Sequence, residues 1–182
     1  SVSYTLYDVG RRFSYYLEQE RPDKHLPPEQ REGWIDFMVD LARFEQLHFS
    51  LFDAPGYEGK SWPAAEIPDN HLVLQPCFAL GIYRYPVAWY YHTFSEEPDL
   101  PFPTQKESYV AILRKDYQLS TFPLNRIHYL FLKHLQASQD IANSLEHIAE
   151  VTKVPLFQVT NSWCQEVRDS WLNAGFFADV RF

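Results

Sequence analysis

Glu45 and His48 form the residue pair whose spacing comes closest to that of a metal site. Glu-x-x-His places two ligands on one face of a helix, as in di-iron carboxylate bundles. Such a site needs a second copy of the motif and two more carboxylates, and the chain offers none at matching spacing: His147 directly follows Glu146, and Glu150 comes three residues later, in reverse order. We therefore expect no metal here, and a capping role or a buried, hydrogen-bonded imidazole for His48.

Residues for nucleophilic catalysis lack the motifs that would activate them. The chain has six glycines, no Gly-x-Ser-x-Gly elbow and no glycine-rich phosphate loop. Cys77 and Cys164 stand 87 residues apart without a Cys-x-x-Cys motif, which favours two buried thiols in a reducing compartment over a disulfide or a reactive thiol. The sequence thus predicts no catalytic residue, no metal and no cofactor, in a protein that is not an enzyme.

The composition is that of an ordinary globular chain with an acidic balance. The 182 residues are 46% hydrophobic and 22% charged, with a formal net charge of −8. Neutralising phosphates requires a surplus of Lys and Arg, so nucleic acid is disfavoured as a partner. No apolar run reaches 18 residues, and we expect a cytoplasmic protein without a membrane segment. Aromatic residues reach 17%, and they either fill a bulky core or serve an interface.

The first part of the chain is predicted to be helical. Apolar residues at steps of three and four indicate a short amphipathic helix over residues 6–19. Pro28 supplies a rigid start for a longer helix, which ends near the proline and glycine of residues 53–56. Residues 57–69 are typical of a linker or long loop. We expect residues 1–69 to form one helical region, the remainder of a longer helical domain.

Residues 70–182 are predicted to contain strands followed by three helices. Strands are expected at 71–75, 79–85, 108–114 and 117–122, the last two joined by a turn at Lys115-Asp116. Helices are expected from Pro123, from Ser138 or Gln139, and from about Pro155 to Asn173, before a left-handed cap at Gly175 and a last strand over 176–182. The predicted fold class is α+β: an N-terminal helical region, a small antiparallel sheet and a three-helix, winged-helix-like C-terminal domain. A strand edge beside a helix is a place where an extended peptide can dock.

Three segments recur with similar order and spacing in a known family. They are Asp40–Glu45 (Asp-Leu-Ala-Arg-Phe-Glu), Leu51–Pro55 (Leu-Phe-Asp-Ala-Pro) and Arg84–Val87 (Arg-Tyr-Pro-Val). By these segments the chain resembles the HvfC/BufC family, described as carrying a DNA-binding domain. Its C-terminal third also resembles the winged, PqqD-like elements that hold leader peptides of ribosomally made, modified peptides. Members of the family are encoded beside multinuclear non-haem iron oxidative enzymes. The resemblance therefore implies an accessory subunit that presents a precursor peptide to such an enzyme.

The resemblance to PqqD-like elements also implies where the peptide would lie. By analogy, the free edge would be the strand formed by Tyr109, Val110, Ala111, Ile112 and Leu113. The wall beside it would be the third helix, around Trp163, Glu166, Val167 and Ser170. Core packing is the alternative role for Trp163 and Val167, and Arg114 is expected to be solvated.

Four residues in or near the matching segments are candidates for a domain or partner interface: Arg43, Glu45, Arg84 and Tyr85. A buried salt bridge between Glu45 and these arginines, joining the helical part to the sheet, would explain their presence. The alternative is a contact to the partner enzyme, because guanidinium groups bind carboxylates well.

Two other functions stay open at this point. A DNA-binding transcriptional regulator would place the third helix in the major groove, although Arg168 is the only Lys or Arg between Pro155 and Asn173. An oligomerising scaffold without a peptide ligand is the other alternative, and it would use exposed aromatic residues for self-association.

Overall fold

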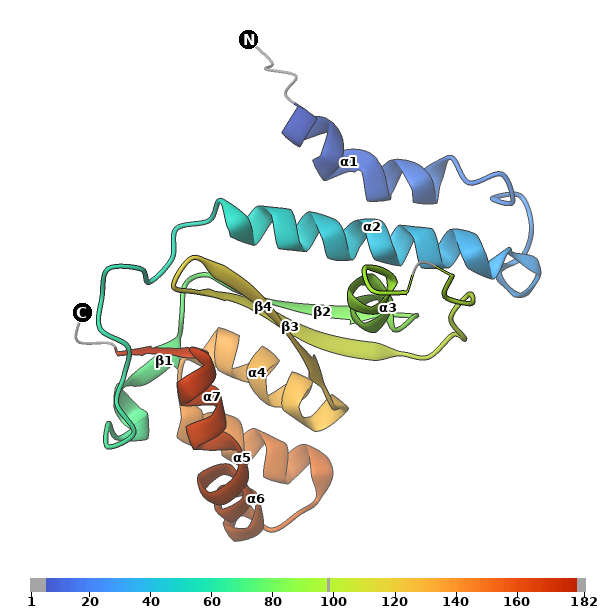
Figure 1. Cartoon of the computed structure of the whole chain (residues 1–182). Coiled ribbons are helices and arrows are strands. Elements are labelled where there is room, and N and C mark those ends of the chain that lie inside the picture. The colour runs from blue at the N-terminus through green and yellow to red at the C-terminus, as the bar shows by residue number, and fades with distance from the viewer. Residues whose placement is uncertain (1–5, 98, 180–182) are drawn as a thin grey trace. The chain divides into compact units, whose positions relative to one another are not determined.

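The computed structural model describes residues 6–97 and 99–179 (Figure 1). Helices and small antiparallel sheets share the chain, so the α+β class is confirmed at the level of a mixed helical and antiparallel fold. The helices are α1 (Leu6–Gln19), α2 (Gly33–Phe52), α3 (Val87–Phe94), α4 (Arg126–Ser138), α5 (Ile141–Thr152), α6 (Leu156–Ser162) and α7 (Arg168–Ala174), with a π-helical turn, η3 (Trp163–Val167), between α6 and α7. The strands are β1 (Leu72–Leu74), β2 (Phe78–Tyr83), β3 (Ser108–Lys115), β4 (Gln118–Leu124) and β5 (Phe177–Asp179).

The chain divides into two compact units that are discontinuous in sequence. Unit 1 comprises the described residues up to Ser50 together with Gly81–Ser108, and unit 2 comprises Leu51–Leu80 together with the described residues from Tyr109 onward. The predicted boundary between residues 69 and 70 does not coincide with this division. Whether residues 1–69 and 70–182 each fold independently stays a prediction.

Unit 1 is built around α2, whose inner face meets the end of β2 and helix α3. Phe37 and Phe44 lie on that face and are at most 5% exposed. The ring of Phe44 lies 6.0 Å from Tyr83, and that of Phe37 lies 5.8 Å from Tyr85, both in edge-on geometry. At the start of the helix, a Cβ on Gly33 would come 2.6 Å from the Tyr85 hydroxyl, so this position has to be glycine while the tyrosine stays in place.

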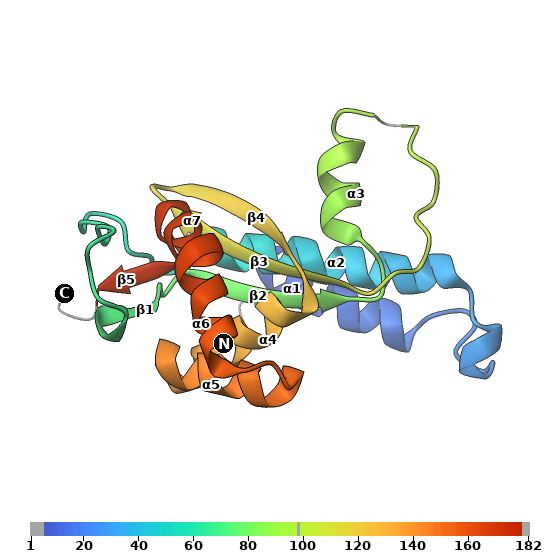
Figure 2. The same ribbon diagram turned by 90° about the horizontal axis from the view of Figure 1, so that it is seen from below.

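Unit 2 has a single apolar core between the sheet and the C-terminal helices. The figures place α4 next to the sheet and α5 beyond it (Figures 1 and 2). Asn125 and Asp140 cap α4 and α5 by accepting hydrogen bonds from the third backbone N–H of each helix. Gly175 (φ 86°) ends α7, where a Cβ would come 2.7 Å from the Lys115 side chain, and this confirms the predicted left-handed cap. The core residues include Leu72, Leu113, Leu132, Leu135, Ile148, Trp171, Phe176 and Phe177.

Over residues 6–97 and 99–179, the strands form two separate antiparallel sheets. β1 pairs with β5, from Leu72↔Asp179 to Leu74↔Phe177, and the two strands lie side by side in both views (Figures 1 and 2). The other sheet has the order β2-β3-β4. The predicted hairpin is confirmed: β3 and β4 pair from Tyr109↔Leu124 to Lys115↔Gln118. Its two-residue turn is Asp116-Tyr117, both with positive φ, one residue later than the predicted Lys115-Asp116. The predicted last strand is present over Phe177–Asp179, and residues 180–182 lie outside the described residues.

Arg114 of β3 is buried, contrary to the expectation of a solvated side chain. Its guanidinium donates to the carbonyl oxygens of Leu51 (2.9 Å), Phe52 and Ala54 (2.7 Å), the last carbonyls of α2 and the turn after it. It also forms a two-pronged ion pair with Glu58 (2.6 and 3.2 Å), and these hydrogen bonds lower the pKa of the Glu58 carboxyl group. One arginine thereby neutralises the C-terminus of a helix and anchors the segment that follows it.

We expect Arg114→Met to destabilise the protein by about 3 to 5 kcal/mol, because it leaves the Glu58 carboxylate buried without a partner. Urea unfolding followed by circular dichroism measures the change. Arg126→Met, which removes an exposed arginine at the start of α4, is the matched control and should lie within about 0.5 kcal/mol of the wild type. A loss below about 1 kcal/mol in Arg114→Met would show that the ion pair does not hold this segment.

Candidate functional site

The strand predicted as the peptide-binding edge lies inside the sheet. β3 is flanked by β2 on one side and by β4 on the other. Val110, Ala111, Ile112 and Leu113 are each at most 2% exposed. The prediction of a free edge at Tyr109–Leu113 is therefore wrong, since the hairpin partner and the preceding strand occupy both sides of this segment.

The outer strand next to these residues is β4, and the register shows which of its main-chain groups point outward. Arg114 uses its N–H to reach the Cys77 carbonyl (3.1 Å), and its carbonyl accepts from the Gln75 side chain (2.9 Å), so both groups point away from β4. Arg114 and its partner Leu119 therefore form a non-hydrogen-bonded pair of the antiparallel ladder. The N–H and C=O of Leu119 accordingly point away from β3. Pro123, four residues later, also belongs to a non-hydrogen-bonded pair. Its nitrogen therefore points away from β3, where the ladder needs no N–H.

The predicted helical wall is only partly a surface. Trp163 is buried at 3% exposure and donates its indole N–H to Asp69 (2.7 Å), so the core-packing alternative describes it. Val167 is half-buried and packs against the core, whereas Ser170 is exposed. Glu166 is exposed and accepts a hydrogen bond from Ser162 (2.8 Å). Trp163, Glu166 and Val167 belong to the π-helical turn η3, and such turns are frequent at functional sites.

An apolar cavity of about 320 Å³ lies among the helices of unit 2. Trp163 and Val167 both contribute to its wall, so the structure brings these two predicted residues together at one site. Burial lowers the pKa of His128, while the nearby Glu166 carboxylate acts in the opposite sense, so this imidazole is neutral at neutral pH. The cavity suits an aliphatic or aromatic group. Its other lining residues include Ile127 and Phe131 of α4, Leu145 and Ile148 of α5, and Val159 of α6.

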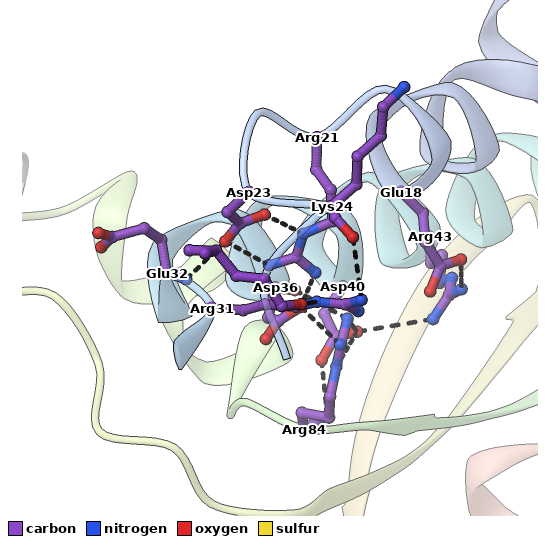
Figure 3. A network of polar contacts seen from close by, with 11 residues as sticks. Glu18, Arg21, Asp23, Lys24, Arg31, Glu32, Asp36, Asp40, Arg43 and Arg84 are labelled. Atoms are coloured by element: carbon purple, nitrogen blue, oxygen red, sulfur yellow. Dashed lines mark hydrogen bonds and ion pairs between the residues drawn. The ribbon is translucent and has the colours of Figure 1, made fainter. Parts of the chain in front are cut away.

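A chain of alternating charges runs through unit 1 (Figure 3). Arg84 lies at its centre, with ion pairs to Asp36 (2.7 Å) and Asp40 (3.1 Å) and a hydrogen bond from its backbone N–H to Asp40 (2.6 Å). On one side Asp36 also binds Arg21 (2.6 Å), which in turn binds Asp23. On the other side Arg43 contacts Asp40 (3.8 Å) and binds Glu18 of α1 (2.6 Å). The chain ties α1 and α2 to the residue that follows β2.

The predicted partner of Arg84 was Glu45, and this pairing is wrong. Asp36 and Asp40 are one helical turn apart and share the face of α2 that meets Arg84, whereas Glu45 lies about 140° further around the helix and is exposed. Arg43 is also exposed. Tyr85 is 3% exposed and packs within unit 1, 5.8 Å from Phe102. Two acidic residues spaced i, i+4 in the otherwise apolar first half of α2 were the signal that could have identified Asp36 and Asp40.

No cluster of three or more His, Cys, Asp or Glu side chains that could hold a metal occurs among residues 6–97 and 99–179. Over the same residues, no helix has both the length and the apolar character of a membrane span. An open cavity of about 670 Å³ in unit 1 is lined by charges of both signs, including Glu18, Arg43 and Lys106. Its chemistry therefore favours no single class of ligand.

Comparison of the chain with protein-family models gives no match, and no curated protein matches it either.

Asp23 supports a prediction about pH dependence, because its hydrogen bonds from Arg21 lower its pKa to about 2. In the unfolded chain an Asp takes up its proton near pH 4. The stabilisation is therefore complete above about pH 4 and is lost as the pH falls towards 2. Asp23→Asn should flatten the pH dependence of the unfolding free energy across this window, measured by urea titrations at several pH values. Asp99→Asn, which changes an exposed acid, should retain the wild-type slope. An unchanged slope in Asp23→Asn would contradict the assignment.

Proposed function

We propose that the chain is a non-catalytic accessory subunit, which binds a ribosomally made precursor peptide and presents it to an iron-dependent peptide-modifying enzyme. The observation that carries the proposal is the position of β4. Among the described strands it is an outer strand of its sheet, and it leads within two residues into the helix whose first turn lines the apolar cavity. Addition of a strand to a sheet edge is a recurring mode of peptide recognition.

The docking strand in this proposal is β4 in place of the strand at residues 109–113. The outward N–H and C=O of Leu119 and the outward carbonyl of Pro123 form part of the ladder for an added peptide. Such main-chain hydrogen bonds give affinity without reading the sequence of the peptide. Specificity then has to come from side-chain pockets beside the strand.

The cavity supplies such a pocket. Asn125 alone separates the end of β4 at Leu124 from the start of α4, and Ile127 and His128 of that helix line the cavity with Trp163 and Val167. A peptide paired along β4 would pass this end of the strand and insert an aliphatic or aromatic side chain. The winged-helix-like character of this part belongs to the same proposal, and the order β2-β3-β4-α4-α5-α6/α7 supports it.

The identity of the partner enzyme rests on the resemblance to the HvfC/BufC family. Two of the resembling segments meet in the structure, since the Asp40 carboxylate of the first accepts hydrogen bonds from the guanidinium and from the backbone N–H of Arg84 in the third. This contact gives the two segments a shared structural role, which supports the resemblance. A multinuclear non-haem iron oxidative enzyme is accordingly the partner that we propose.

DNA binding finds less support. Arg168, the only Lys or Arg between Leu156 and Ala174, is engaged by Asp69 (2.6 Å) and by the carbonyl oxygens of Ala65 (2.8 Å) and Ile67. Binding to the phosphate backbone beside the major groove needs free Lys or Arg side chains, and the one arginine of this stretch is used within unit 2.

Leu119→Pro tests the docking strand, since it removes one outward N–H and leaves the bonds between β3 and β4 in place. We expect the affinity for a fluorescein-labelled precursor peptide to fall about tenfold, the equivalent of about 1.4 kcal/mol, in a fluorescence anisotropy titration. Leu119→Ala, which keeps the N–H, is the matched control and should stay within about threefold. Equal affinities of a folded Leu119→Pro protein and the wild type would place the peptide elsewhere. Salt-sensitive binding of duplex DNA, with no peptide binding, would favour the regulator.

Val159→Phe tests the cavity by filling it from the α6 side. Val159 is half-buried, so the larger ring enters the open volume and the core stays packed. We expect peptide affinity to fall at least tenfold, with the thermal midpoint of unfolding unchanged within a few degrees. Val151→Phe adds the same ring at an exposed position of α5 outside the cavity and should bind as the wild type does. Unchanged binding by Val159→Phe would remove the cavity from the proposal.

A further inference from the structure

The outer side of α2 carries large apolar side chains that nothing in unit 1 covers. Trp34, Met38 and Phe49 are 53%, 40% and 63% exposed. Their spacing of four and eleven residues puts them on one side of the helix, along a row of about 22 Å. Large apolar side chains at such exposure along one helix face mark a surface that is normally covered by a partner.

The other sides of α2 are already in use within unit 1. Arg43 and Gln46 contact α1 through Glu18 (2.6 Å) and Ser14 (3.3 Å), and Figure 1 shows α1 alongside α2. Asp40 binds Arg84, on a side about 150° around the helix from the exposed row. The row thus lies on a different side from these contacts, and it is turned by about 100° from the inner face that carries Phe37 and Phe44.

Helix α3 widens this face. The ring of Tyr91, 40% exposed, lies 5.3 Å from Phe44 and 5.8 Å from His48, beside the row. We call Trp34, Met38, Phe49 and Tyr91 the apolar face. It exposes roughly 400 Å², taking about 200 Å² for each large side chain. A standard protein interface buries about 800 Å² per partner, so the apolar face has the size of an interface core that still needs a polar rim.

Glu45 specifies what can cover the apolar face. It lies between Met38 and Phe49 in the row and is exposed, and the structure gives it no ion pair among the described residues. A carboxylate that becomes buried requires a cationic partner. Glu96, Glu97 and Asp99, just after α3, add further negative charge in the same unit, while the only Lys or Arg of α2 is Arg43, held by Glu18.

We propose that the apolar face is the docking surface for a partner protein that brings apolar side chains and at least one Lys or Arg opposite Glu45. A second copy of the same face would oppose Glu45 to Glu45 without a free cation, and like charges at an interface oppose association. An anionic bilayer would be repelled by the same acidic residues. In naming the occupant as the peptide-modifying enzyme, the inference rests on the proposed function. It separates two tasks: unit 1 holds the enzyme and unit 2 holds the peptide.

The test measures two affinities of each full-chain variant, one for the purified enzyme by calorimetry and one for the labelled precursor peptide by anisotropy. Trp34→Ser combined with Phe49→Ser should weaken enzyme binding at least 100-fold and change peptide binding less than twofold. Glu45→Lys should weaken enzyme binding at least tenfold, and it tests the charge without removing any apolar side chain. Tyr15→Ser, which removes a 65% exposed aromatic from α1, is the matched control and should bind the enzyme within threefold of the wild type.

Enzyme binding that is unchanged in the folded double variant and in Glu45→Lys would overturn the inference and leave the proposed function intact. Wild-type protein that binds the peptide and fails to bind the enzyme would also overturn it. Wild-type protein that binds neither component would remove the proposed function together with the inference. A wild-type dimer that dissociates on Trp34→Ser, seen by light scattering, would assign the face to a second copy. Binding to vesicles with about 30% phosphatidylserine that the double variant loses would assign it to a membrane.

Discussion

The guanidinium of Arg114 is the constraint on which unit 2 depends. A buried arginine has to satisfy its donors, and here a carboxylate and the last carbonyl groups of a helix do so. The main chain of the same residue is fixed by Cys77 and by the side chain of Gln75. With its side chain and both main-chain groups engaged, the residue sets the phase of the hairpin. That phase decides which groups of β4 face outward, and thus which surface can accept another strand.

Much of the secondary structure was predictable because it depends on local patterns. The first helix, the β3–β4 hairpin and the cap at Gly175 follow from apolar spacing, a two-residue turn and a left-handed glycine. Strand order does not follow from such patterns. Periodicity says which face of a strand is buried, and it says nothing about which strand lies at the edge. The predicted peptide site therefore fell on the central strand.

Polar partners were also hard to assign from the sequence. Arg114 was expected to be solvated because the sequence does not show that its guanidinium donates to the carbonyl groups at the end of α2. The positions of Glu45 and Arg84 in the matching segments suggested that they pair. On the helix, however, Asp40 faces Arg84 and Glu45 points about 140° away, so the ion pair forms with Asp40. The same angle leaves Glu45 on the outer side of α2. Glu45 is one of the four predicted interface residues. Its outward position keeps it out of the ion pairs of Arg84 and makes it available to the partner that we propose.

The π-helical turn at Trp163–Val167 has a consequence for how this chain can vary. In a regular α-helix, side chains four residues apart drift by about 40° with each step, so Trp163, Val167 and Trp171 would spread over about 80°. The π-helical turn removes most of the 40° drift between Trp163 and Val167, and all three side chains line the same cavity. Because a π-helical turn holds one residue more than an α-helical turn, deleting one residue here would restore a regular helix and leave α6 in nearly the same rotation relative to α7. The π-helical turn can therefore lose one residue with the cavity wall changed only at the turn itself, whereas a deletion within α6 or α7 would rotate the rest of that helix by about 100°.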